Sequence, residues 1–186
     1  SLTLLKKNFL NQFPYPVVVF VENSFKETWK KELHKKSRVN CHFETIEFRV
    51  PSFLNPKAIP EFVYHPKFKI GYRHMCRFFS GTIYEQPILK DYRWYWRLDT
   101  DSFVLGKVKY DVFQFMEENN FVYGYNIMST DEPAVSHGLW ELTRRYIEDR
   151  NIKPTFLYEF IKDGEWDRSY YYTNFEISSM DFWHSK

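Results

Sequence analysis

The sequence predicts an α/β fold in which a mixed, mainly parallel sheet is flanked by helices, and three observations support that class. Tyr15–Asn23 is a continuous apolar segment, which is typical of a strand buried on both faces. A helical period follows, because Phe25, Trp29 and Leu33 recur at every fourth residue. Strand-like and helix-like segments then alternate along the chain, which is the pattern of βα units.

The other elements of the first third follow from local patterns. Ser24 and Glu27 have the spacing of a capping box, which would satisfy the free amides at the start of the first helix. The alternating segment Phe43–Val50 predicts a second strand. Residues 51–69 contain four prolines and no regular period, so we expect a long irregular connection of the kind that often forms a lid or a binding loop.

A helix is predicted to begin at Gly71, and a strand is predicted at 93–98. One face of the helix would carry Tyr72, Met75, Cys76 and Phe79, and another would carry Arg73 and Arg77. In the strand, one face would carry Trp94, Trp96 and Leu98, and the other Arg93, Tyr95 and Arg97.

The rest of the chain is expected to hold three helices and two strands. These are helices at 112–119, 138–150 and 155–161, strands at 121–128 and 170–177, and a turn at Asp163–Glu165. No internal repeat or low-complexity linker divides the sequence. Residues 1–186 are therefore interpreted as a single domain.

Composition and charge argue against several classes of function. The formal net charge is only +2 and the basic residues are spread along the chain, so we expect no nucleic-acid partner and no membrane contact by this segment. Aromatic residues make up 21% of the sequence, which favours a large core or a ring-lined cleft over disorder. Cys41 and Cys76 are too few for a disulfide framework, and they would pair only if their Cα atoms lie within about 7 Å.

The segment Asp99–Asp101 is the main candidate for chemistry. Two carboxylates at positions i and i+2, at the carboxyl end of a strand, can point to one side and bind Mg²⁺ or Mn²⁺ together with substrate phosphates. An ordinary polar turn that ends the strand would give the same pattern. Arg97 has a planar guanidinium suited to phosphate, and its alternative role is an ion pair with the same aspartates.

Five longer stretches resemble a known family. They are Gly71–Gly81, Pro87–Asp101, Tyr110–Ile127, Gly138–Ile147 and Thr173–Ser185. In their order and spacing they resemble glycosyltransferase family 15, the fungal α-1,2-mannosyltransferases. The resemblance implies a GT-A fold, with a Rossmann-like nucleotide half and an acceptor half. It also implies a retaining enzyme that transfers mannose from the donor GDP-mannose to a glycan or glycoprotein hydroxyl, with Mn²⁺ (or Mg²⁺), in the Golgi lumen.

The same resemblance suggests which residues bind the donor and the metal. Asp99 and Asp101 match the family's metal-binding acidic motif. Arg97 matches an arginine that contacts the diphosphate region, and Arg73 is a weaker candidate for the same region.

Two further residues match catalytic positions of the family. Tyr72 matches an active-site tyrosine, and its alternative role is that of a core ring. Glu176 matches a carboxylate placed near the anomeric carbon, and its alternative role is that of a solvent-facing strand residue. His74 is expected to be a hydrogen-bonded structural histidine.

The sequence also departs from the family pattern at three points. Asp99 stands where the family has Glu, which shortens the first metal ligand by one methylene. The family's Cys and His before the Asn-Phe-Glu motif are absent from Tyr170–Thr173. The family pattern continues to a histidine metal ligand after the position of Lys186, so we expect that the metal site is completed differently or that activity needs a part that this chain lacks.

Three alternatives stay open at this point. One is a GT-A transferase that uses a UDP-sugar, and another is a non-catalytic relative that binds glycans or nucleotides. A structural α/β domain without a ligand also fits the local patterns, but it leaves the ordered block of matches unexplained.

Overall fold

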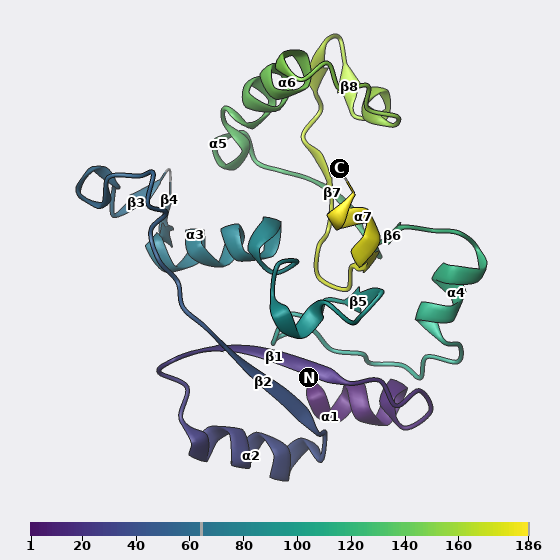
Figure 1. Ribbon diagram of the computed structural model, residues 1–186. Helices are drawn as coiled ribbons and strands as arrows, with labels where there is room; N and C mark the ends of the chain where they lie inside the picture. The colour runs from purple at the N-terminus through teal and green to yellow at the C-terminus, as the bar shows by residue number, and fades with distance from the viewer. Residues whose placement is uncertain (64, 186) are drawn as a thin grey trace.

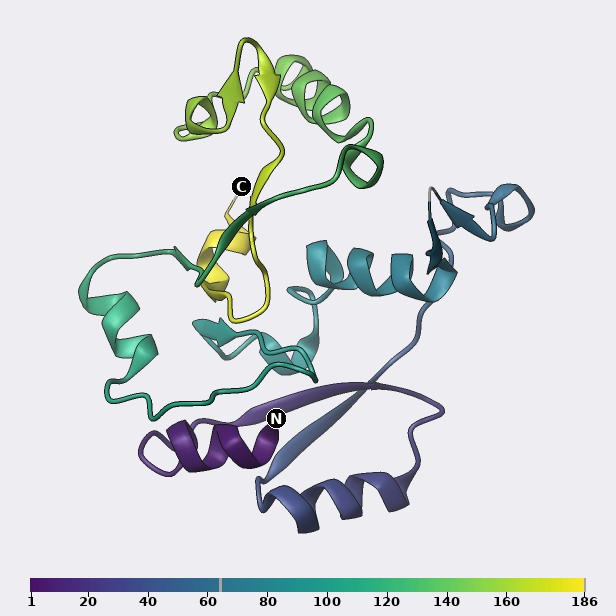
Figure 2. The ribbon, with the colours of Figure 1, turned by 180° about the vertical axis from the view of Figure 1, so that it is seen from behind.

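The computed structural model describes residues 1–63 and 65–185, and its elements form three tiers (Figure 1). The first tier contains α1 (Leu2–Leu5), β1 (Val17–Glu22), α2 (Glu27–Ser37) and β2 (Cys41–Ile46). The middle tier contains α3 (Ile70–Arg77), β5 (Trp94–Trp96), α4 (Val112–Glu118), β6 (Tyr123–Gly124), β11 (Ile177–Ser179) and α7 (Met180–His184). The third contains α5 (Pro133–Ser136), α6 (Leu139–Asp149), β8 (Ile161–Lys162) and β9 (Glu165–Trp166), and the view from behind shows the same separation (Figure 2).

Shorter elements connect and extend these tiers. Two π-helices, η1 (Lys6–Leu10) and η3 (Phe78–Thr82), continue α1 and α3. The 3₁₀ turns are η2 (Pro56–Ala58), η4 (Pro87–Leu89) and η5 (Leu157–Glu159). Two more antiparallel pairs are β3 (Phe62–Val63) with β4 (His65–Lys69), and β7 (Met128–Thr130) with β10 (Ser169–Tyr171).

The first strand, helix and second strand form a parallel βαβ unit. β1 and β2 pair in register from Val17 opposite Cys41 to Glu22 opposite Ile46, so this part of the prediction is confirmed. The predicted capping box is wrong, because the helix begins at Glu27 after Lys26 and no side chain caps it. A turn in which the Phe25 amide donates to the Glu22 carbonyl (2.9 Å) leaves Ser24 before the helix start.

The prediction of a mainly parallel sheet is wrong. Among the described residues, only β1 and β2 pair in parallel, and the other pairings are antiparallel. A period of two residues shows which strand faces are buried but carries no information on strand direction. The central sheet instead places β11 between β5 and β6, antiparallel to both.

Several predicted boundaries also change. The second strand ends at Ile46 and not at Val50, because its partner β1 ends opposite that residue. The strand predicted at 121–128 divides into β6 and β7, and the one at 170–177 divides into β10 and β11. The helices predicted at 112–119 and 138–150 are confirmed as α4 and α6, whereas 155–161 holds the single turn η5 and the first residue of β8.

The connection at 51–69 is less irregular than predicted. Part of it follows the expected loop, but it also contains η2 and the β3–β4 pair. Tyr64, which belongs to the same predicted connection, lies outside the described residues.

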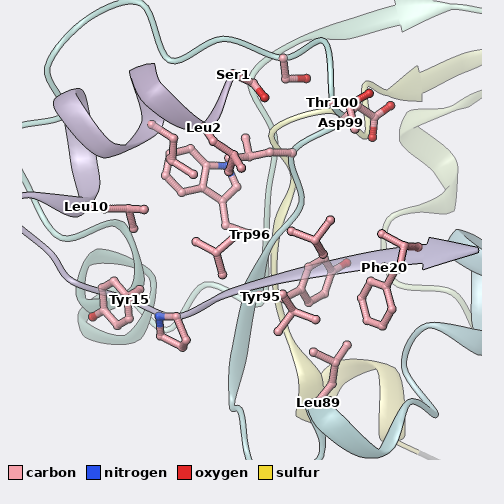
Figure 3. Close-up of a pocket in the computed structure, with 18 of the residues that line it drawn as sticks. Ser1, Leu2, Leu10, Tyr15, Phe20, Leu89, Tyr95, Trp96, Asp99 and Thr100 are labelled. Atoms are coloured by element: carbon pink, nitrogen blue, oxygen red, sulfur yellow. The ribbon is translucent and has the colours of Figure 1, made fainter. Parts of the chain in front are cut away.

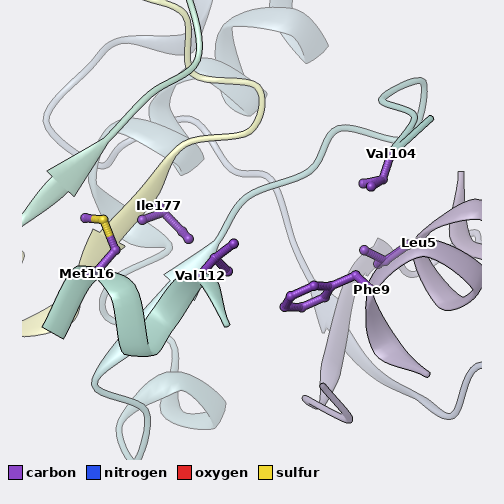
Figure 4. Packing of buried hydrophobic residues seen from close by; sticks show 6 residues of the cluster. All are labelled: Leu5, Phe9, Val104, Val112, Met116 and Ile177. Atoms are coloured by element: carbon purple, nitrogen blue, oxygen red, sulfur yellow. The ribbon is translucent and has the colours of Figure 1, made fainter. Parts of the chain in front are cut away.

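Two buried clusters join the first tier to the middle tier. The first joins α1 and η1 to the segment before α4, to α4 itself and to β11, through Leu5, Phe9, Val104, Val112, Met116 and Ile177 (Figure 4). The second joins η3, η4 and α7 through Phe78, Ile83, Tyr84, Leu89 and Met180, and β1 packs against it. The N-terminal helical turns were not predicted from the sequence, yet they supply Phe9, which is only 2% exposed. In the part of the chain that the structure describes, no helix has the length and apolar character needed to cross a bilayer.

Phe9→Ala should lower the free energy of unfolding by about 3–5 kcal/mol, because a buried ring would be replaced by a cavity. The ring of Phe9 packs edge-on against Trp96 of β5 with a centroid distance of 5.1 Å, so the substitution would also remove a packing contact of the central sheet. Urea denaturation of the variant measures the change. Phe53→Ala is the matched control, because Phe53 is 80% exposed and its loss should change stability by less than about 0.5 kcal/mol. Equal effects of the two substitutions would contradict the packing of η1 in this core.

Candidate active site

The Asp-Thr-Asp segment forms a turn directly after β5. The carbonyl of Asp99 accepts a hydrogen bond from the Ser102 amide (2.9 Å), and the side chain of Asp99 is half-buried while that of Asp101 is exposed. Asp99 and Thr100 lie at one edge of a cavity of about 1490 Å³, whose walls include Tyr95 and Trp96 (Figure 3). The turn is therefore placed where a ligand in the cavity could contact its carboxylates.

Arg97 is held beside the first aspartate. Its Nε donates to Oδ1 of Asp99 (3.1 Å), and its guanidinium lies 3.8 Å from the ring centroid of Phe79. The side chain of Arg97 is only 11% exposed and that of Asp99 is 32% exposed, so this ion pair is partly shielded from solvent. The bond to Asp99 uses one of the five N–H donors of the guanidinium.

Asn174 connects the Asn-Phe-Glu motif to the acidic turn. In the amide orientation that satisfies both of its polar atoms, its nitrogen donates to Oδ1 and Oδ2 of Asp99 (2.8 and 2.6 Å) and its oxygen accepts from the hydroxyl of Tyr172 (2.8 Å). Asn174 was not predicted as a site residue, although its place in the family motif was a usable signal.

The next residue, Phe175, has a strained backbone. Its φ is +67°, which is an uncommon value for a bulky side chain. Two backbone hydrogen bonds hold this conformation against β5: the Phe175 amide donates to the Arg97 carbonyl (3.0 Å), and the Arg97 amide donates to the Glu176 carbonyl (2.9 Å). The turn thereby aims Asn174 at Asp99 and places Glu176 at the start of β11.

Glu176 is buried, with only 4% of its surface exposed. Its Oε1 accepts from the hydroxyl of Tyr95 (3.0 Å), and its Oε2 accepts from the hydroxyl of Tyr123 (2.8 Å). Burial raises the pKa of the Glu176 carboxyl, and the bonds from Tyr123 and Tyr95 and the charge of Arg97 partly offset that rise. The solvent-facing alternative for this residue does not hold, since Glu176 points into the protein.

Tyr95 and Tyr123 are polar partners that the sequence interpretation missed. Burial is the largest cause of the raised pKa of both phenols, and their contacts with Glu176 raise it further. The phenols therefore stay protonated and can donate. Tyr95 alternates with Trp94 and Trp96 on β5 and shares a strand face with Arg97, which was the available signal for it.

The candidate residues on α3, which are Tyr72, Arg73 and His74, contact different parts of the chain. The ring of Tyr72 is 45% exposed and stacks on Phe68 (4.8 Å between centroids), and burial, with smaller effects from Cys76, Asp131 and Asp99, raises its pKa.

Arg73 and His74 contact other parts of the chain. The guanidinium of Arg73 donates to the carbonyls of Pro60 (2.6 Å) and Glu61 (3.3 Å) in the preceding loop. The ring of His74 stacks on that of Phe48 with a centroid distance of 5.7 Å. Cys41 and Cys76 are free thiols.

The side chains of the site supply only some of the ligands that a hard divalent cation needs. Within residues 1–63 and 65–185, no three His, Cys, Asp or Glu side chains converge on one point. Asp99 and Asp101 nevertheless supply oxygen atoms of the type that Mg²⁺ and Mn²⁺ prefer, and such ions commonly take one or two protein carboxylates and complete their shell with water and phosphate oxygens. The residues present therefore fit a metal that is bound jointly with a diphosphate.

An acidic turn at the edge of a cavity, joined through Asn174 to the turn that carries a buried carboxylate, has the concave form and convergent polar groups of a ligand site. The sequence matches the family profile described as "Glycolipid 2-alpha-mannosyltransferase" over residues 1–186, and the chain belongs to this family, glycosyltransferase family 15.

Named relatives and solved structures agree with this assignment. The chain is 29% identical over 207 residues to "Probable mannosyltransferase KTR3" of Saccharomyces cerevisiae, covering 100% of this chain and 50% of that protein. The structure of the mannosyltransferase Ktr4p from S. cerevisiae in complex with GDP superposes with a TM-score of 0.82 at 25% identity, covering 100% of this chain and 54% of the other. Core-mannan synthase A from Aspergillus fumigatus, in its Mn/GDP form, shares the fold with a TM-score of 0.82 at 24% identity, and 56% of that chain is covered. The chain thus spans about half the length of the relatives it matches.

The buried position of Glu176 predicts a specific dependence of stability on pH. Its pKa in the folded state lies above the ordinary value of 4.5, so the stability associated with this group is fully present below that pH and falls as pH rises through the folded-state pKa. We expect the unfolding free energy of the wild type, minus that of Glu176→Gln, to fall as pH is raised above 4.5. Urea denaturation at a series of pH values measures this difference.

Glu47→Gln is the control for this series. Glu47 is exposed, and its pKa is lowered by the hydrogen bond from Arg49, so removal of its charge should produce no such fall. A difference for Glu176→Gln that is flat or rises with pH would show that the carboxyl is not buried as described.

Proposed function

We propose that this chain forms the donor-binding and catalytic region of a retaining α-1,2-mannosyltransferase that moves mannose from GDP-mannose to a hydroxyl of a mannoside or glycan. The observation that supports this most directly is the contact of Asn174 with Asp99, because it brings the metal-type carboxylates and the turn that carries Glu176 into one site. The family membership and the GDP complex of Ktr4p support the choice of donor. We assign the GT-A arrangement to the fold on the same grounds.

The nucleotide end of the donor is proposed to occupy the cavity beside the acidic turn. Its volume of about 1490 Å³ exceeds the several hundred Å³ of a typical ligand site, so it has room for a nucleotide sugar. Arg97 would contact the diphosphate through the guanidinium N–H groups that do not bind Asp99. Arg73 is proposed for the same region, although its guanidinium contacts the 60–61 loop in this structure.

Asp99 and Asp101 are proposed to hold Mn²⁺ or Mg²⁺, with Asn174 orienting Asp99. The metal would offset the negative charge that develops on the leaving diphosphate. The Mn/GDP form of core-mannan synthase A supports the choice of metal. Because Arg97 bonds to one oxygen of Asp99, it would also balance part of the acidic charge before the donor binds.

Glu176 is proposed to act at the anomeric carbon. As an anion it would stabilise the positive charge that develops there, or it would act as a nucleophile, which are the roles of the equivalent carboxylate in retaining glycosidases. Tyr72, which is exposed on α3, is proposed to contact the reacting sugars. The acceptor would be a glycan or glycoprotein, and by the character of the family the reaction would take place in the Golgi lumen.

A donor screen with purified protein tests this proposal. We expect transfer of mannose from GDP-mannose with retention of the anomeric configuration, and stronger binding of GDP-mannose when Mn²⁺ is present. Asp99→Ala should abolish the effect of Mn²⁺ on binding, because a metal ligand is removed, and calorimetric titration with and without Mn²⁺ measures this. Asp149→Ala, at an exposed position at the end of α6, is the matched control.

Other outcomes of the same screen would favour other functions. Turnover only with UDP-sugars would mean that the donor is a UDP-sugar and not GDP-mannose. Binding without turnover would indicate a non-catalytic relative. Affinity for GDP-mannose that is equal with and without Mn²⁺ would sink the metal assignment.

A further inference from the structure

Two phenol hydroxyls bond to the Glu176 carboxylate, and a third lies beside one of them. Tyr95 on β5 bonds to Oε1 and Tyr123 on β6 bonds to Oε2, so each oxygen receives one phenol hydrogen bond. The hydroxyl of Tyr84 lies 3.3 Å from that of Tyr95, and Tyr84 is itself held by a stacked contact with Trp183 at 4.3 Å between centroids. The Tyr84 hydroxyl donates to the Phe79 carbonyl (3.2 Å), and the Tyr95 hydroxyl donates to Glu176 (3.0 Å).

The charges around the carboxylate favour such neutral donors. The positive charge of Arg97, directly after β5, lowers the pKa of Glu176, but its Nε is paired with Asp99, whose negative charge acts in the opposite direction. A phenol donates a hydrogen bond without neutralising the anion, whereas a lysine or arginine partner would cancel its charge. The hydrogen bonds from Tyr95 and Tyr123 therefore do not cancel the negative charge that Glu176 carries when it is ionised.

A buried carboxylate without such donors would take up a proton. Burial raises the pKa of Glu176, and the hydrogen bonds from Tyr123 and Tyr95 act in the opposite direction. Both phenols have pKa values raised by burial, so they keep their protons over the whole range in which the carboxyl titrates. The two hydroxyls thus favour the ionised state and also fix the direction of both oxygens.

We propose that Tyr95 and Tyr123 are positioning residues for the transfer reaction, whose hydroxyls hold Glu176 as an oriented anion at the donor. This inference rests on the role of Glu176 in the proposed function, but it assigns to two further tyrosines a task that their rings alone cannot perform. It concerns the hydroxyl groups specifically, because the rings pack in the core around β11.

The test measures the titration of Glu176 by ¹³C NMR of protein labelled at the glutamate carboxyl carbons. The signal is identified by its loss in Glu176→Gln. We expect the titration midpoint to rise by about one to two pH units in Tyr123→Phe and in Tyr95→Phe, since each removes a hydrogen bond to a charged group. The control is Tyr171→Phe, whose ring packs against that of Tyr123 at 5.8 Å without any hydrogen bond to Glu176, and its midpoint should match the wild type.

A variant that should shift the titration midpoint in the opposite direction provides a second test in case a phenylalanine variant misfolds. Difluorotyrosine in place of Tyr123 keeps the ring and makes its hydroxyl a stronger donor, so the midpoint should fall. In the transferase assay, the acidic limb of the pH profile of kcat should shift with the NMR midpoint in each variant. KM for GDP-mannose should stay within about twofold of the wild type.

The possible failures can be told apart. A Glu176 midpoint that is the same in the wild type, both phenylalanine variants and the fluorinated protein would overturn the role of the tyrosines. A wild type that transfers no sugar would overturn the proposed function, and the NMR titration would still decide whether the hydroxyls hold the anion. Shifted midpoints with an unmoved acidic limb of kcat would overturn the positioning role in catalysis.

Discussion

The backbone pairing of β5 with β11 holds the candidate site together. Arg97, directly after β5, exchanges hydrogen bonds with Phe175 and Glu176, directly before β11. These bonds offset the strain of a bulky residue at positive φ, which costs on the order of 1–3 kcal/mol. Because the turn is held in this way, Asn174 reaches Asp99 on one side and Glu176 enters the core on the other. Two segments more than 70 residues apart in the sequence thus share one site.

The charges of the site follow from that arrangement. Asp99 lies at the cavity edge, where it pairs with Arg97 and can also meet a cation and a diphosphate. Glu176 is buried, with 4% of its surface exposed, and the hydrogen-bond partners of its carboxylate are neutral phenols. The two carboxylates therefore have different environments: Asp99 is paired with a cation, whereas Glu176 is buried with a raised pKa and bonds to neutral hydroxyls. This separation is what a metal-assisted transfer with a buried carboxylate would require.

The sequence predicted the parts of this structure that depend on local patterns. The β1–α2–β2 unit, the helices α4 and α6, and the acidic turn after β5 all follow from periodicity over a few residues. Local patterns could not show that the strand predicted at 170–177 is interrupted at 172–176, because the bonds that stabilise the positive φ of Phe175 come from Arg97, far away in the chain. The burial of Glu176 and its contact with Tyr123 were missed for the same reason, since only the pairing of β11 with β6 brings them together.

The coupling between the acidic turn and the Asn-Phe-Glu turn is best measured by a double-mutant cycle. The affinity for GDP in the presence of Mn²⁺ would be compared in the wild type, Asn174→Ala, Asp99→Ala and the double variant. If the two turns form one site, Asn174→Ala should weaken binding in the wild type but have little effect once Asp99 is gone, giving a coupling free energy of about 1 kcal/mol or more. Losses that add to within about 0.5 kcal/mol would contradict the account, because they would mean that the two turns act independently.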